Sequence, residues 1–294
     1  MRRVLLYQVV DRLKDRYSVS SLCAYWGFPR SSYYLWVKNE KPLYKHFDAP
    51  LAQRITAIFN ETYKGYRFIC YQLRRKYHIF RNPKTILRYM RILGLTSKVR
   101  KKRYQSCTQR ERNEKARHVH HNMLARNFKA SRPLEKLVTD VSYVYHKQGR
   151  MFLSVIKDLY DNSILAYTLS NCNDNRLVFD NLDLVFKDTW DATRTCILHS
   201  DQGFQYTNQL YLRKLDSYGV TISHSRKGNC YDNAPCENFF SHLKSESLTL
   251  FPPESQKQLI RQIKDYIDWY NMDRPQEKLK GMTPVQYREA YLHN

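Results

Sequence analysis

Two patterns of hydrophobic and polar positions divide the chain of 294 residues. As far as about residue 95, apolar residues recur every three or four positions, as they do on one face of a helix. From Leu137 onward, short β-branched and aromatic runs alternate with polar turns, as they do in strands. The pattern therefore predicts a first part made only of helices and a second part that mixes helices with a sheet.

The first helices are predicted within residues 17–36. This segment has the pattern of two short helices interrupted at Gly27–Phe28–Pro29, because glycine and proline both end helices. Ser20 and Ser31 are the expected N-caps, since a serine side chain can accept a hydrogen bond from a free backbone N–H group. We expect residues 1–46 to form a small helical segment of helix-turn-helix type.

Three more helices are predicted in residues 50–96, near 51–62, 66–77 and 83–93. The third begins at Asn82–Pro83, with asparagine as the cap and proline at the first helical position. One of its sides is apolar, and the opposite side carries Lys84, Arg88 and Arg91. This arrangement is typical of the recognition helix of a helix-turn-helix DNA-binding domain, although a basic surface helix that enters no groove has the same pattern.

A basic segment follows at residues 97–131, and we interpret it as a linker. Arg100, Lys101, Lys102 and Arg103 lie there beside Tyr104. Clustered cations next to an aromatic residue favour binding along the phosphate backbone of DNA. The segment therefore favours DNA binding by the helices before it, but phosphate contacts carry no information on base preference.

The second part begins with three successive strands and then alternates helix and strand. The predicted strands are 136–146, 150–160, 163–170, 195–201 and 220–225, and the predicted helices are 175–190, 208–219 and 231–246. This order implies a mixed sheet with helices on both faces. We expect the core to span residues 132–250 and a helical tail to span residues 251–294.

The charge is distributed as unevenly as the hydrophobic pattern. Residues 1–135 hold 31 Lys+Arg and 8 Asp+Glu, whereas residues 136–294 hold 19 of each, so the formal net charge of +23 lies in the first part. This asymmetry favours a nucleic-acid enzyme over a membrane-surface protein. No apolar run approaches the ~20 residues of a membrane span. Seven cysteines without a C-x-x-C pair favour reduced thiols, so we expect a cytoplasmic protein with no membrane partner.

Three carboxylates of the second part are candidate catalytic and metal-binding residues. Asp140 lies inside the first predicted strand, Asp201 ends the fourth, and Glu237 lies on the last helix of the core. A central first strand beside the fourth would bring the two aspartates together, and the helix could add Glu237. Clustered carboxylates need a cation, and their oxygen atoms favour two Mg²⁺ or Mn²⁺ ions. Each acid alone could equally be a turn or hydrogen-bonding residue, and we expect Asp158 on the second strand to be structural or to lie behind the ligands.

Basic residues near these acids are candidate contacts to DNA. Lys244 follows Glu237 by seven positions and therefore lies on the same face of a helix, where it could meet a phosphate. Arg226 and Lys227 precede this helix and are further candidates. A plainer interpretation of Lys244 is a solvated polar stripe above an apolar one, which most amphipathic helices have.

At these residues the chain resembles the orfB product of the IS-three family of bacterial insertion sequences, a transposase with a retroviral-integrase-like core. The matching words are VTDVSYV, HSDQGFQYTN, SRKGNCYDNAPCENFFSHLKSE and YIDWYNMDRPQEKLKGMTPVQYR, and YKGYRFICYQLRRKYHIFRNPKTILRYMRILGL is similar to the family's helix-turn-helix segment. The gaps of 60 residues from Asp140 to Asp201 and of 35 from Asp201 to Glu237 match the family's Asp–Asp–Glu signature. Lys244 falls where the family has a basic residue. Leu137 departs from the usual Trp and Gln276 from a frequent His.

The resemblance implies an α/β fold, with an RNase H-like mixed-sheet catalytic core behind an N-terminal all-α helix-turn-helix region. It implies metal-dependent cleavage of DNA at the ends of an insertion sequence, followed by strand transfer in which one end attacks the other to give a circular intermediate. The implied partners are double-stranded DNA, as terminal repeats and target, and a second or further copy of the chain.

An orfA-type partner or fusion is also implied, because the sequence has no sustained heptad run like that of orfA. The expected location is the bacterial cytoplasm, on the nucleoid when the protein is bound to DNA. Two alternatives stay open, a catalytically silent DNA-binding regulator derived from a transposase and a nuclease of the same fold.

Overall fold

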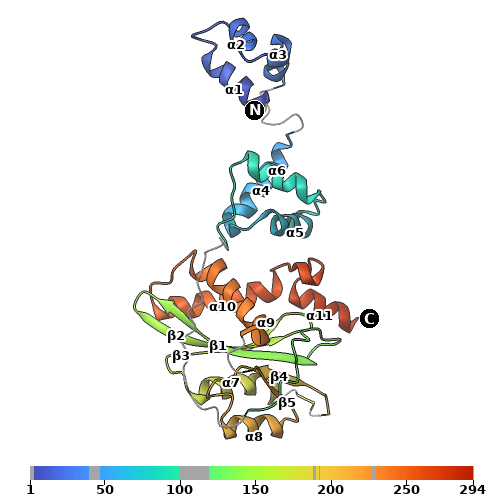
Figure 1. Ribbon diagram of the computed structural model, residues 1–294, viewed down its shortest axis with the longest axis vertical. Coiled ribbons are helices and arrows are strands. Elements are labelled where there is room, and N and C mark those ends of the chain that lie inside the picture. Colours follow the sequence, from blue (N-terminus) through green and yellow to red (C-terminus); the bar gives the residue numbers. More distant parts are fainter. Residues whose placement is uncertain are drawn as a thin grey trace. The chain divides into compact units, whose positions relative to one another are not determined.

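The computed structural model describes residues 3–39, 47–99, 119–187, 190–191, 193–226 and 230–293. The chain divides into two compact units, Met1–Lys98 and Val99–Asn294 (Figure 1). Five predicted DNA contacts, Arg100, Lys101, Lys102, Arg103 and Lys227, lie outside the described residues.

The first unit begins with three short helices, α1 (Arg3–Leu13), α2 (Val19–Tyr25) and α3 (Arg30–Lys38). They share a small aromatic core made of Tyr7, Val10, Leu22, Cys23, Phe28, Tyr33 and Trp36. The two helices predicted within residues 17–36 are confirmed, and α1 is an additional helix that the sequence did not predict.

The predicted N-caps of these helices are wrong. Ser18 caps α2, because its hydroxyl accepts a hydrogen bond from the Ser21 N–H over 3.1 Å. Pro29 precedes α3 and makes no side-chain cap bond. Ser20 and Ser31 each lie one residue inside the first turn, whereas a capping side chain must belong to the residue before the helix.

Three further helices complete the first unit, α4 (Ala49–Thr62), α5 (Tyr66–Tyr77) and α6 (Pro83–Ile92). Their ends agree with the prediction to within about two residues, and Asn82 caps α6 by accepting from the Lys84 N–H over 2.9 Å. Ile86 and Met90 of α6 are buried in a core shared by the three helices, so the apolar side of α6 faces inward.

The second unit is built on a five-stranded mixed sheet with the strand order β3-β2-β1-β4-β5. The strands are β1 (Lys136–His146), β2 (Gly149–Asp158), β3 (Ile164–Ser170), β4 (Ile197–Ser200) and β5 (Thr221–His224). β2 is antiparallel to both of its neighbours, β1 and β3, whereas β4 and β5 run parallel to β1. The prediction that the first strand is central and lies beside the fourth is therefore confirmed.

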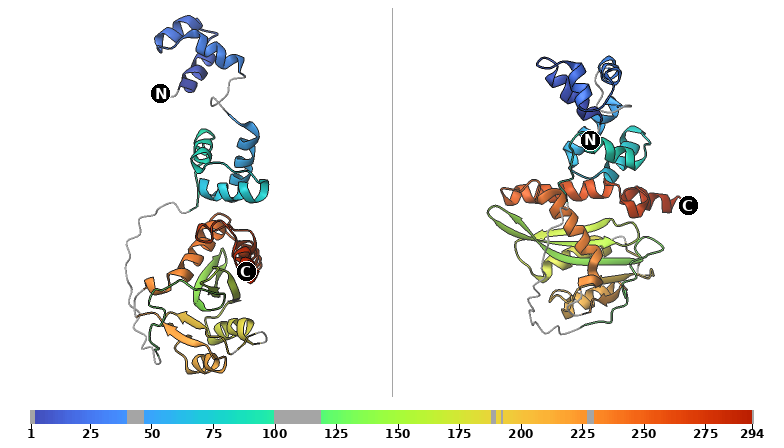
Figure 2. Two further views of the ribbon diagram at one scale, coloured as in Figure 1. Left: turned by 90° about the vertical axis from the view of Figure 1, so that its right-hand side faces the viewer. Right: turned by 45° about the horizontal axis from the view of Figure 1, so that its top comes forward.

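Helices cover both faces of this sheet (Figure 2). α7 (Asn175–Phe186) and α8 (Gln209–Ser217) pack with Leu137, Ile156 and Leu198 on one face. α9 (Ala234–Leu243) and α10 (Gln256–Met272) pack with Val138, Val144 and Val155 on the other. Leu137 and Val138 therefore point to opposite faces of the sheet, as successive residues of a strand do.

The helix predicted at residues 231–246 is three consecutive pieces. A 3₁₀ turn, η1 (Cys230–Asn233), precedes α9, and a π-helical turn, η2 (Lys244–Leu248), follows it. Pro235 explains the late start of α9, because proline has no backbone N–H and is tolerated only in the first turn of a helix.

The tail of residues 251–294 packs into the same core as the sheet. Ile263, Tyr266 and Tyr270 of α10 belong to the hydrophobic cluster of α9 and β1. A 3₁₀ turn, η3 (Glu277–Leu279), then leads to α11 (Pro284–Leu292).

Asp158, at the end of β2, is fully buried and accepts from the Arg288 guanidinium of α11 over 2.7 Å, so it has the structural role expected of it. Among the described residues, none of the helices combines the length and the apolar character needed to cross a bilayer.

Candidate active site

Asp140 lies on the central strand, on the face that α9 covers. It is two residues beyond Val138 and four before Val144, which both contact the α9 and α10 core, so the two-residue period of β1 directs Asp140 to that face. One carboxylate oxygen accepts a hydrogen bond from the Val141 N–H over 2.8 Å. The sheet therefore holds this carboxylate on a rigid, partly buried position.

Asp201 follows the last residue of β4, next to Asp140. Val138 of β1 pairs with His199 of β4 in the parallel register, and each aspartate is two residues beyond its member of this pair. The Gly203 N–H donates to an Asp201 oxygen over 2.9 Å. A Cβ atom at position 203 would approach this oxygen to 3.0 Å, so the turn favours glycine there.

Glu237 lies in the first turn of α9, and Lys244 begins the turn that follows the helix. Glu237 is exposed, whereas Lys244 is partly buried and donates from Nζ to the Ser142 hydroxyl over 2.7 Å. Lys244 also borders a hollow of about 410 Å³ that Tyr143 and Tyr145 help to line. The lysine therefore lies against β1 and is not part of a freely solvated stripe.

The three carboxylates share one electrostatic environment. The pKa of Asp140 is raised to about 8, first by burial and then by the negative charges of Asp201 and Glu237, against the opposing effects of the Val141 N–H and Lys244. Burial raises the pKa of Asp201, and burial with the Asp201 charge raises that of Glu237. Both of these residues keep contact with solvent. The group cannot be fully ionised at neutral pH without a compensating cation.

The donor chemistry of this group fits a hard divalent cation, because the group offers carboxylate oxygens and neither thiolate nor imidazole. The three carboxylates are, however, too far apart to share a metal ion as they stand. Within the described residues, no three His, Cys, Asp or Glu side chains converge closely enough to hold a metal ion. Binding therefore requires the carboxylates to draw together, and the exposed side chain of Glu237 has the freedom to do so.

The other predicted DNA contacts lie in two different settings, an exposed helix face and an ion pair. Lys84, Arg88 and Arg91 are exposed on α6, opposite its buried apolar side. Arg226 lies in the loop after β5 and forms an ion pair with Asp232, with 2.9 Å between Nη2 and the carboxylate. The sequence did not point to Asp232, although this residue lies within one of the quoted segments, because two of its partners, Asn122 and Arg126, are more than a hundred residues away.

Comparisons with known proteins agree with both units. A family model described as "HTH-like domain" matches residues 46–103, and two models described as "Integrase core domain" match residues 130–230 and 237–292. The chain is 36% identical over 288 residues to the putative transposase InsK for insertion sequence element IS150 of Escherichia coli, covering 97% of this chain and 99% of that protein. It is 26% identical over 295 residues to the transposase InsF for insertion sequence IS3A of the same organism, covering 97% and 99%.

Among solved structures, the catalytic core domain of HTLV-2 integrase in complex with magnesium aligns with a TM-score of 0.43 at 14% identity, covering 54% of this chain and 98% of that one. The length and identity of the InsK match, together with the three domain matches, settle the family. The chain belongs to the transposases of bacterial insertion sequences, with an HTH-like domain followed by an integrase core domain.

Proposed function

We propose that Asp140, Asp201 and Glu237 are the catalytic carboxylates of this transposase and hold two divalent metal ions. The observation that carries the proposal is the register of β1 and β4, which brings Asp140 and Asp201 to the same level of adjacent strands. The mutual effect of the three charges on the pKa of Asp140 supports it. When bound, Mg²⁺ or Mn²⁺ supplies compensating charge at the attacking and leaving oxygens of an in-line phosphoryl displacement.

The proposed reaction has two steps at phosphodiester bonds of DNA. In the first, water attacks the phosphorus at an end of the insertion sequence, a new P–O bond replaces the broken one, and a free 3′-hydroxyl leaves. In the second, this hydroxyl attacks another phosphodiester and displaces its 3′-oxygen, so the number of P–O bonds is unchanged. The first target is the other end of the element, which gives a circular form, and the circle is later inserted into target DNA.

The protein's side chains position the DNA for these steps. Lys244 lies beside Asp140, and its charge is suited to the phosphate next to the reacting one. Lys84, Arg88 and Arg91 form the basic face of α6, which we propose enters DNA at the terminal repeats. Arg226 remains a proposed contact, with one part of its guanidinium engaged by Asp232.

Two ends must be brought together for one to attack the other, so we propose that at least two copies of the chain act on DNA. An orfA-type partner or fusion would supply a dimerisation element. A catalytically silent DNA-binding regulator is the second candidate, and it is disfavoured because Asp140, Asp201, Glu237 and Lys244 are all present. A nuclease without strand transfer shares the same site and is separated from the transposase by product analysis.

The test uses the full chain, Mg²⁺ and the DNA that flanks its gene, with cleavage and joining mapped at nucleotide resolution. Asp140→Asn, Asp201→Asn and Glu237→Gln should abolish both steps and leave DNA binding largely intact, because carboxylates bind metal and not bases. Asp180→Asn, on the exposed side of α7, is the matched control. Near wild-type cleavage by any of the three variants removes that residue from the site, and cleavage without joining favours the nuclease.

A further inference from the structure

A short arm, residues 119–126, lies against β5 in the second unit. It lies within the predicted basic linker of residues 97–131 and is the first described segment after residue 99. The His120 N–H donates to His224 Nδ1 over 2.8 Å, and the N–H groups of Met123 and Leu124 donate to the Ser223 hydroxyl oxygen over 2.9 and 3.3 Å. Leu124 is buried in the core that contains α9. The arm is therefore docked by both its backbone and its apolar side chain.

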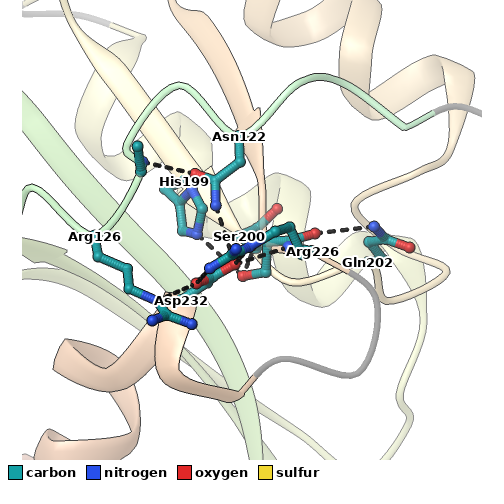
Figure 3. A network of polar contacts seen from close by, with 9 residues as sticks. Asn122, Arg126, His199, Ser200, Gln202, Arg226 and Asp232 are labelled. Atoms are coloured by element: carbon teal, nitrogen blue, oxygen red, sulfur yellow. Dashed lines mark hydrogen bonds and ion pairs between the residues drawn. The ribbon is translucent and has the colours of Figure 1, made fainter.

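The side chain of Asp232 connects the arm to η1, the 3₁₀ turn before α9 (Figure 3). Its carboxylate has no exposed surface. It accepts from Asn122 Nδ2 over 3.0 Å and from Arg126 Nε over 2.8 Å, which are both arm residues. It also accepts from the backbone N–H, Nε and Nη2 of Arg226, over 3.0, 2.9 and 2.9 Å. A buried carboxylate with this many donors is strongly held.

The next residue connects this cluster to the candidate active site. Asn233 Nδ2 donates to the carbonyl oxygen of Thr139 over 3.2 Å, and Thr139 directly precedes Asp140 on β1. α9 starts at Ala234, one residue after Asn233, and carries Glu237 in its first turn. The Asp232–Asn233 pair therefore fixes the start of α9 to the strand that bears Asp140.

A second chain of hydrogen bonds leads from the arm to Asp201. The Ser223 oxygen already accepts two arm N–H groups, so its own proton points to His199 Nδ1, 2.8 Å away. The other ring nitrogen of His199 then donates to the Ser225 hydroxyl over 3.0 Å. Ser225 donates to the carbonyl oxygen of Ser200 over 3.3 Å, and Ser200 precedes Asp201.

We propose that the docked arm is a positioning element of the active site, which acts through Asp232 and Ser223 to hold the elements bearing Asp140, Asp201 and Glu237 in their relative places. The inference rests on the metal site proposed above and adds a role for the linker to it. A purely structural ion pair would stabilise the fold without favouring metal binding.

Arg126→Ala tests the arm without opening the Arg226–Asp232 pair, since the Arg126 side chain is about half exposed. In the full chain, we expect the Mn²⁺ concentration for half-saturation, measured by electron paramagnetic resonance of free Mn²⁺, to rise about 10-fold, as it does when residues behind metal ligands are removed. The kcat of end cleavage should fall while the KM for DNA ends changes little. Arg126→Lys should recover part of the loss, and Arg176→Ala on α7 is the matched control.

Asp232→Asn should have the larger effect, because it weakens the contacts to the arm and to Arg226 together. If this variant does not fold, Asn122→Ala, which removes one arm bond to Asp232, takes its place. Unchanged Mn²⁺ affinity in folded Arg126→Ala and Asn122→Ala overturns the positioning role, provided that the wild type binds Mn²⁺ and Asp140→Asn does not. A wild type that binds no Mn²⁺, or an Asp140→Asn variant that binds it normally, overturns the metal site itself and this inference with it.

Discussion

The ammonium group of Lys244 and the hydroxyl group of Ser142 are joined by a hydrogen bond of 2.7 Å. Ser142 is two residues beyond Asp140, on the same side of β1. Burial lowers the pKa of Lys244, and the charge of Asp140 opposes this effect. The lysine is therefore held beside the carboxylates by a neutral partner, which does not neutralise its positive charge.

We predict that Lys244→Ala lowers strand transfer more than it lowers thermal stability, because the charge that positions the DNA phosphate is lost. Lys244→Arg should keep part of the activity, since the charge persists while the geometry of the contact changes. Ser142→Ala removes the hydrogen-bond partner but keeps the charge of Lys244, so it should lower joining less than Lys244→Ala does and cost about 1 kcal/mol of stability or less. Joining of labelled DNA ends and thermal unfolding give both quantities. A folded Lys244→Ala protein that joins ends at the normal rate would show that Lys244 has no role in positioning DNA.

The basic face of α6 gives a second prediction, made on the full chain. Lys84→Ala, Arg88→Ala and Arg91→Ala should each weaken binding to duplex DNA. Each should also reduce the salt dependence of binding, by about one unit of slope for every phosphate that the variant no longer neutralises. A residue that reads a base should instead lose roughly 1–3 kcal/mol of discrimination between sequences.

Binding measured at several salt concentrations, on terminal and unrelated DNA, separates the two cases for α6. Arg261→Ala on α10 removes the same kind of charge from an exposed position of the other unit and serves as the control. Equal affinities of the three α6 variants and the wild type would show that α6 does not enter DNA.

The central part of the fold could be predicted because its cues are local. The β-branched run around Asp140 fixes a strand, its two-residue period fixes the face, and the strand order follows from three strands succeeded by alternating helices and strands. The spacing of Asp140, Asp201 and Glu237 then indicated the site. The expected neighbouring places of β1 and β4 implied that the two aspartates would be close, but the register that sets them at one level is a tertiary property.

What escaped prediction depends on contacts between distant residues or on small backbone shifts. Asp232 receives hydrogen bonds from Asn122 and Arg126, more than a hundred residues earlier in the chain, and no local pattern indicates such partners. The π-helical turn that starts at Lys244 changes which neighbour each N–H meets, although the apolar spacing there still resembles that of an α-helix. The two serine caps were each misplaced by two positions, since helix ends are set by the whole turn.

A third prediction concerns the buried ion pair between η2 and the segment after α10. Arg274 donates from Nη2 and Nε to the two oxygens of Glu246 over 2.7 and 2.9 Å, and the Tyr266 hydroxyl donates to the same carboxylate over 2.8 Å. Arg274→Ala should lower the free energy of unfolding by about 3–5 kcal/mol, because it leaves a buried carboxylate without its charged partner.

The double variant Arg274→Met with Glu246→Leu should recover much of this loss, since it removes both charges and keeps the packing volume similar. Urea unfolding of the full chain measures both proteins. A single variant that is as stable as the wild type would mean that Glu246 finds solvent or another donor when Arg274 is gone.

The last prediction follows from His224, whose ring is fully used in its neutral form. Its Nδ1 accepts from the His120 N–H over 2.8 Å, and Nε2 donates to the Tyr206 carbonyl over 3.2 Å. The pKa of His224 is lowered to about 4, mainly by burial and also by the nearby His120 ring, while the hydrogen bond to the Tyr206 carbonyl opposes this shift. A proton on His224 Nδ1 would face the His120 N–H, and the hydrogen bond between them would be lost. Acid should therefore weaken the docking of the arm and lower the stability of the fold.

The sign follows from the two pKa values. Between about pH 6.5, the ordinary pKa of histidine, and about pH 4, the unfolded chain binds a proton at residue 224 that the folded chain does not. The stabilising contribution is therefore complete above about pH 6.5 and is lost as the pH falls, by about 2 kcal/mol at pH 5. His224→Gln cannot titrate, so its free energy of unfolding should depend less on pH than that of the wild type by this amount. Urea unfolding at about pH 7 and pH 5 measures the difference, and parallel pH dependences of the two proteins would show that His224 is not a source of acid sensitivity.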